Sequence, residues 1–230
     1  MNIKLVHWLV KLGLNKIDSQ TFTDVTPNII DEELNKCQLT LIRDKLRTNQ
    51  GFEFNRLIKT DLSSLVILGE NITTNSNQIK FQDLEYPLLH FIRAELLVEK
   101  DDCSKVIPVY EKQFDDRSRT NAIQESSFKW ERAIGFIAKD TTTDSNAALF
   151  IDKPDFLIQE AYIDYLRYPK EVCLGGYNDI DNNPKLTEEF EFGNDMINQI
   201  IDLCVFNLAA KLDYQDAKMK YEMSQLSKIT

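Results

Sequence analysis

The feature that most constrains the fold is an apolar stripe in the last part of the sequence. Apolar side chains recur there at steps of four residues, as four pairs and one further leucine: Met196, Ile197, Ile200, Ile201, Cys204, Val205, Leu208, Ala209 and Leu212. This spacing puts them on one face of an α-helix, and that face must be buried against another element. The sequence therefore predicts a long helix that starts near Thr187, with a polar tail beyond Tyr214 that either extends the helix or frays.

A first N-terminal helix is predicted from Ile3, because apolar side chains cover most of its circumference. Its polar side chains form a narrow stripe that we expect to meet water: Lys4, His7, Lys11 and Asn15. After a turn at residues 15–19, Thr26 and Pro27 suit the N-cap and the first position of a second helix. Proline is tolerated there because it lacks an N–H that would in any case have no partner.

The second helix is predicted to run to about Arg47. It carries apolar residues at helical spacing: Ile30, Leu34, Cys37 and Leu41. We expect four side chains in the middle of the helical stripes to be core residues: Leu34, Leu41, Val205 and Leu208. Residues 49–51 end the helix, and residues 52–62 fit either a short helix or a packed loop.

The middle of the sequence has the pattern of β-strands. Residues 64–81 mix apolar side chains with glycine and asparagine, which predicts short strands and turns. The apolar range 88–98 fits either a helix or a strand. Residues 132–139 and 147–152 flank the polar stretch 140–146, and together they predict a hairpin.

A third strand is expected from Phe156 to Tyr168, and Pro169 ends it because proline cannot donate to a β-ladder. One side of this strand should hold four apolar side chains: Leu157, Ala161, Ile163 and Tyr165. The predicted class is α+β, with N-terminal helices, a central antiparallel β region and a long C-terminal helix that packs back on the helical part. Residues 1–63 and 185–230 would form a helical bundle, and residues 64–184 a β-rich region within the same structural unit.

The charge balance argues against a general nucleic-acid binder. Acidic residues outnumber basic ones by 37 to 27, which gives a formal net charge of −10. Affinity for a phosphate backbone comes from Lys and Arg that replace condensed counterions. The acid excess gives solubility, or else it repels a polyanion. No apolar run approaches the ~18 residues needed to span a membrane, so no membrane partner is expected.

No catalytic, cofactor-binding or metal-binding residue is predicted from the sequence. The cysteines lie far apart and suggest free, buried thiols rather than a zinc site or redox pair: Cys37, Cys103, Cys173 and Cys204. The two histidines, His7 and His90, have no nucleophile nearby in the sequence that would indicate a triad. The seven glycines do not form a phosphate-binding loop.

Three acidic stretches of the sequence have simpler explanations than a catalytic or metal-binding site. Residues 115–118 suggest a loop or the start of a short helix. Residues 179–183 are similar to a calcium loop, but Pro184 stands where the loop needs glycine and Phe190 where it needs a bidentate glutamate. A third group would complement the dipole at the start of the predicted last helix: Glu188, Glu189 and Glu191.

Several short motifs follow one another in an order that carries a family resemblance. The N-terminal ones are Leu14–Ser19 (LNKIDS), a helix, Gly51–Glu53 (GFE) and Lys59–Leu62 (KTDL). The later ones are Tyr86-Pro87, Tyr165–Pro169 (YLRYP) and the helix Ile200–Leu212. This order resembles that of the head-tail connector (ring) proteins of crAss-like and related short-tailed bacteriophages.

The resemblance implies a structural virion protein rather than an enzyme. Such a subunit would form a closed ring, a dodecamer, between the portal and the tail, and would help to line the DNA channel without binding DNA specifically. It implies synthesis in the bacterial cytoplasm and no catalytic or cofactor residues. The alternatives are another virion component, such as a tail-hub or capsid-associated protein, or a small α+β enzyme or regulator.

Overall fold

A computed structural model describes residues 1–17, 25–48, 60–74, 76–112, 126–139, 147–152, 154–178 and 183–226. The chain divides into two compact units, and each is described by itself. The helical unit contains residues 1–64 and 169–230, and the β unit contains residues 65–168. Residues 169–184, which were predicted to be part of the β-rich region, fall in the helical unit. No helix in the described ranges is long and apolar enough to cross a membrane.

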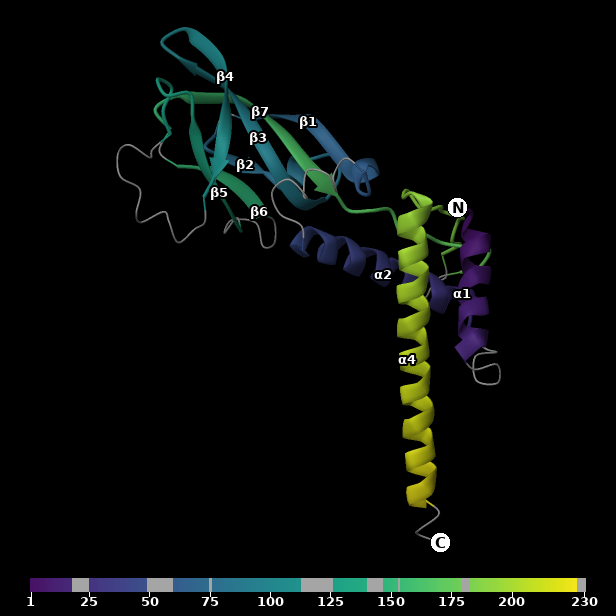
Figure 1. Cartoon of the computed structure of the whole chain (residues 1–230). Helices are drawn as coiled ribbons and strands as arrows, with labels where there is room; N and C mark the ends of the chain where they lie inside the picture. The colour runs from purple at the N-terminus through teal and green to yellow at the C-terminus, as the bar shows by residue number, and fades with distance from the viewer. Residues whose placement is uncertain are drawn as a thin grey trace. The chain divides into compact units, whose positions relative to one another are not determined.

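The helical unit is built from α1 (Ile3–Ile17), α2 (Pro27–Thr48) and α4 (Asn194–Leu226), and α4 contacts both of the others. Figure 1 shows α4 as one long continuous helix. Gly13 of α1 lies against Val205 of α4, where a Cβ atom would come within 2.8 Å of the valine side chain. The absence of a side chain at Gly13 therefore allows the two helices to approach closely.

The buried stripe of α4 confirms the predicted helical face. Six of its apolar side chains and Cys204 are buried: Met196, Ile197, Ile200, Ile201, Leu208 and Ala209. Val205 is only half-buried, as is Leu41 of α2, where Ile42 takes the core position instead. Of the four expected core residues, only Leu34 and Leu208 are therefore fully buried.

The start of α4 was predicted seven residues too early. The helix begins at Asn194, not near Thr187, because the preceding segment is extended. The Glu188 N–H donates to the Cys173 carbonyl oxygen (2.9 Å), and the Cys173 N–H donates back (3.2 Å). A backbone that is paired in this ladder cannot also form helical hydrogen bonds.

In the β unit, seven strands form one curled, mostly antiparallel sheet (Figure 1). The strands are β1 (Val66–Thr73), β2 (Gln78–Lys80), β3 (Leu88–Lys100), β4 (Cys103–Glu111), β5 (Ala133–Lys139), β6 (Ala147–Ile151) and β7 (Leu157–Arg167). Their order is β1-β7-β3-β4-β5-β6-β2. The β5–β6 hairpin is confirmed, and the ambiguous range 88–98 is a strand. The predicted antiparallel β region is confirmed, with the β4–β5 pair as its one parallel pair among the named strands.

One side of β7 departs from the predicted alternation. Ala161, Ile163 and Tyr165 are buried as expected, but Leu157 is 72% exposed and Ile158 is buried in its place. The register between β3 and β7 shifts by one residue at Leu97/Val98. Such a bulge moves every side chain beyond it to the opposite face of the strand.

Candidate functional site

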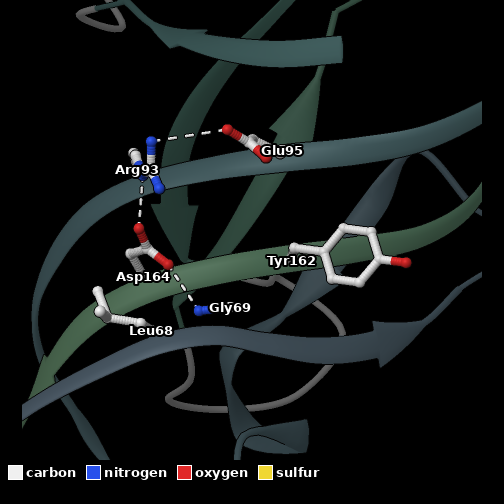
Figure 2. A pocket seen from close by; sticks show the side chains of 6 residues that line it. All are labelled: Leu68, Gly69, Arg93, Glu95, Tyr162 and Asp164. Carbon is white, nitrogen blue, oxygen red and sulfur yellow. Dashed lines mark hydrogen bonds and ion pairs between the residues drawn. The ribbon is translucent and has the colours of Figure 1, made fainter. Parts of the chain in front are cut away.

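The best-defined polar site of the β unit lies where β1, β7 and β3 run side by side (Figure 2). A cavity of about 220 Å³ is lined there by Leu68, Gly69, Arg93, Glu95, Tyr162 and Asp164. Asp164 of β7 points toward Arg93 of β3, and its Oδ2 accepts a hydrogen bond from the arginine Nε at 2.5 Å. Its Oδ1 accepts a second hydrogen bond from the Gly69 N–H at 2.6 Å. We call this the Arg93–Asp164 pocket.

A bulge in β1 creates the pocket. The register between β1 and β7 shifts between Ile67 and Glu70, and Gly69 adopts a φ of +63°. A residue that has a side chain loses free energy when it adopts a positive φ, whereas glycine adopts this conformation readily. The bulge takes the Gly69 N–H out of the regular ladder, and the buried Asp164 carboxylate supplies its partner. The bulge also turns Leu68 outward, where it is 72% exposed.

Charge and size restrict what this pocket can hold. Two carboxylates, Glu95 and Asp164, face one guanidinium, and the Glu95 Oε1 lies 3.6 Å from an Arg93 nitrogen. The hydrogen bond from Arg93 to Asp164, and then their charge attraction, raise the pKa of the guanidinium. Pockets for drug-sized ligands are typically ~300 to 1,000 Å³. This smaller, net-negative pocket suits one amphipathic or cationic side chain better than a cofactor.

We predict that Gly69→Ala destabilises the β unit by about 1 kcal/mol, because alanine is strained at positive φ. No atom lies within 4 Å of the added Cβ, so the loss would be conformational and not steric. Gly193→Ala is the matched control, since that site is equally open and has no positive φ. In urea unfolding, the midpoint of Gly69→Ala should be lower than that of Gly193→Ala. Equal midpoints would contradict the role assigned to Gly69.

A second polar cluster lies in the helical unit around the Asp31 carboxylate of α2. Asp31 is only 3% exposed and accepts hydrogen bonds from His7 Nε2 (2.6 Å), the Leu174 N–H (3.0 Å) and the Tyr177 hydroxyl (2.5 Å). We call these four residues the Asp31 cluster. Asp31 thereby joins α1, α2 and the segment before α4. It also explains why His7, expected to face water, is buried instead.

The Asp31 cluster has the character of a structural centre. Burial by itself would raise the pKa of Asp31, but hydrogen bonds from His7, Tyr177 and Leu174 outweigh burial and lower it. Burial, and next the hydrogen bond to Asp31, raise the pKa of Tyr177. The His7 Nδ1 atom is buried and has no hydrogen-bond partner. Because its carboxylate is buried and already held by several donors, the cluster joins segments rather than exposing a reactive group.

The cysteines only partly match the prediction of buried thiols. All four are free; Cys37, Cys173 and Cys204 are buried, whereas Cys103 is exposed at the start of β4. Burial raises the cost of forming a thiolate. Cys37 is also contacted by the side chains of Glu33 (3.9 Å) and Asn207 (3.4 Å). No group of metal-ligating side chains is found within the ranges that the structure describes.

The three glutamates precede α4 and do not lie in its first turn, so the predicted role at the start of that helix is wrong. The Glu189 carboxylate accepts a hydrogen bond from the Ile3 N–H (2.9 Å), so it caps α1 and not α4. Glu191 accepts a hydrogen bond from the Lys170 N–H (3.0 Å), and Glu188 pairs through its backbone with Cys173.

The second histidine, His90, is half-buried, and burial lowers its pKa. Residues 115–118 and 179–182 lie outside the described residues.

Sequence reasoning missed the residues that define both polar clusters. A glycine inside a strand pattern, as at Gly69, is a known signal for a bulge. A histidine in a mostly apolar helix, as at His7, needs a hydrogen-bond partner if it is buried. Neither signal identifies the partner, because Asp31 and Asp164 come from other elements. Comparison of the sequence with known protein families and with curated proteins found no match.

Proposed function

We propose that the chain is a structural subunit of a head-tail connector ring in a short-tailed bacteriophage, and that it has no enzymatic role. The observation that supports this most is the exposure of large apolar side chains in both units. Trp8 of α1 is 57% exposed, Phe206 of α4 is 69% exposed and Trp130 before β5 is 66% exposed. Aromatic residues are enriched in the centres of protein interfaces, where they contribute much of the binding energy.

The motif order from Leu14 to Leu212 supports a ring of identical subunits as the form of this assembly. A closed ring needs a heterologous interface, in which two different surfaces of each subunit meet. The β unit offers apolar side chains on separate elements for such contacts, including Leu68 on β1 and Tyr110 on β4. A tail-hub or capsid-associated protein would use the same kind of surface, so copy number and position in the particle separate the alternatives.

The proposed ring predicts a high, cyclic copy number in the virion. Quantitative mass spectrometry of purified particles should give many copies per particle, as a closed ring requires, and about twelve if the number implied by the family resemblance holds. A tag on this protein should appear between the portal and the tail in electron micrographs. The isolated subunit can remain monomeric, because its neighbours act as a template. One or two copies per particle would refute the proposal.

We also predict that the protein does not retain DNA. Each phosphate contact made by Lys or Arg adds a salt-dependent attraction that must be broken for a genome to move through the ring. With a net charge of −10, the subunit should fail to retard duplex DNA in a gel at ~0.15 M salt. Salt-sensitive binding at micromolar concentration would instead point to a basic surface and a DNA-binding role.

A further inference from the structure

We infer that Trp130 of one copy inserts into the Arg93–Asp164 pocket of the next copy and that this contact closes the ring. The inference rests on the proposed function. Both surfaces belong to the β unit, so the inference needs only the geometry within that unit. One surface is a projecting turn that carries the aromatic side chain. The other is a small acidic cavity with apolar walls.

The turn that carries Trp130 is held in shape by its own backbone. Residues 127–132 form a tight loop in which the Ser127 N–H donates to the Arg132 carbonyl oxygen at 2.9 Å and the Arg132 N–H donates back at 3.3 Å. Glu131 completes the loop with a φ of +50°. A side chain presented on such a preformed loop loses less conformational entropy on binding. We call residues 127–132 the Trp130 turn.

Contacts with the sheet fix the Trp130 turn further. The Phe128 N–H donates to the Asp155 carboxylate (2.7 Å), which also pairs with Lys100 at 2.7 Å. Lys105 pairs with Glu131 at 3.1 Å, and its ammonium lies 4.1 Å from the Phe128 ring centroid. Phe128 therefore anchors the turn, while Trp130 stays 66% exposed. The Lys129 ammonium lies 5.2 Å from the Trp130 ring centroid, so the turn presents an aromatic ring together with a positive charge.

The Arg93–Asp164 pocket complements this turn in charge and in size. Its lining carries two carboxylates against one guanidinium, and the Tyr162 hydroxyl donates to a further carboxylate, Glu160, at 2.7 Å. Leu68 and the Tyr162 ring supply apolar wall (Figure 2). A cavity of about 220 Å³ accommodates one large side chain. The excess of negative charge favours an aromatic side chain that arrives with Lys129 beside it.

Trp130 cannot fill the pocket of its own copy. The turn is attached near Lys100, at one end of β3, whereas Arg93 lies seven residues earlier on the same strand. At ~3.3 Å per residue the two points are roughly 23 Å apart. The turn and the pocket are therefore two different surfaces, and their mutual contact is heterologous. A contact of this type generates a ring when the rotation between copies closes.

Thiol crosslinking in assembled particles tests the inference. All variants carry Cys103→Ser, which removes the cysteine that is exposed in the described part of the chain. Subunits with both Leu68→Cys and Lys129→Cys, which keep Trp130, should give a ladder on a denaturing gel in steps of 26.7 kDa after treatment with a short bis-maleimide. Particles with either cysteine alone should give monomers. A dimer from Lys129→Cys alone, or a crosslink from it to another virion protein, would overturn the inference.

A charge exchange gives a second readout. Lys129→Glu should lower the incorporation of the subunit about tenfold, because it places a carboxylate against the acidic pocket. Glu95→Lys in the same chain should restore incorporation, and Lys11→Glu on α1 serves as a control with the same change in net charge. Particles with a full set of copies but no ladder would refute this contact and leave the ring intact. One or two copies per particle would refute the ring, and this contact with it.

Discussion

Leu208→Asp should prevent the helical unit from folding. Leu208 is only 3% exposed on the face of α4 that packs within this unit, so aspartate there would bury a charge that has no partner. Leu208→Ala removes only the apolar contacts and should lower the free energy of unfolding by about 2 to 5 kcal/mol. Circular dichroism should show a loss of helical signal for the aspartate variant and a lower melting temperature for the alanine variant.

Phe206 provides a matched control on the same helix. It lies two residues before Leu208 and is 69% exposed, so Phe206→Asp adds the same charge on the outer side of α4. Its melting temperature should stay close to that of the unchanged protein. If Leu208→Asp and Phe206→Asp melt alike, the packed face of α4 has been assigned wrongly.

Asp31→Ala should cause the largest loss of stability among substitutions of polar residues. The change leaves the buried His7 Nε2 and the half-buried Leu174 N–H and Tyr177 hydroxyl without their shared acceptor. An unsatisfied buried donor costs ~1 to 3 kcal/mol, and the three losses are not additive, so we expect a total of about 3 to 5 kcal/mol. Tyr177→Phe removes one donor to Asp31 and the acceptor of the Cys173 thiol (3.4 Å), and it should cost only about 1 kcal/mol. Urea unfolding at neutral pH measures all three proteins.

The same carboxylate predicts how this stability depends on pH. Because the folded-state pKa of Asp31 lies below its ordinary value of 3.8, its contribution is fully present above that value. It is lost as the pH falls through the lower, folded-state pKa, where the carboxylate binds a proton. The difference in unfolding free energy between the unchanged protein and Asp31→Asn should therefore be large at neutral pH and should shrink below pH 3.8. A difference that is independent of pH would show that Asp31 does not act through its charge.

The sequence predicts those parts of the fold that depend on local pattern. The stripe of α4, the Pro27 start of α2 and the β5–β6 hairpin each follow from spacing within one segment. The range 88–98 stayed ambiguous because a continuous apolar run fits a helix and a strand equally well. In the structure this range is a strand because it pairs with β4 on one edge and with β7 on the other.

The candidate sites could not be predicted because they depend on partners distant in the sequence. Arg93 and Asp164 are 71 residues apart, and His7 and Asp31 belong to different helices. A one-residue bulge at Leu97/Val98 also reversed the expected orientation of Leu157. Periodicity specifies which face of a segment is apolar. It does not specify the register between segments, and register decides which polar side chains meet.

The division of the chain into units has a consequence for synthesis on the ribosome. The β unit is one continuous stretch, whereas the helical unit combines residues 1–64 with residues 169–230. At ~5 to 20 residues per second, α1 and α2 leave the ribosome roughly 7 to 30 seconds before α4 begins to appear. During that interval the β unit can fold, but the apolar faces of α1 and α2 still lack the helix that covers them. The chain thus completes its helical unit last, once α4 has been made.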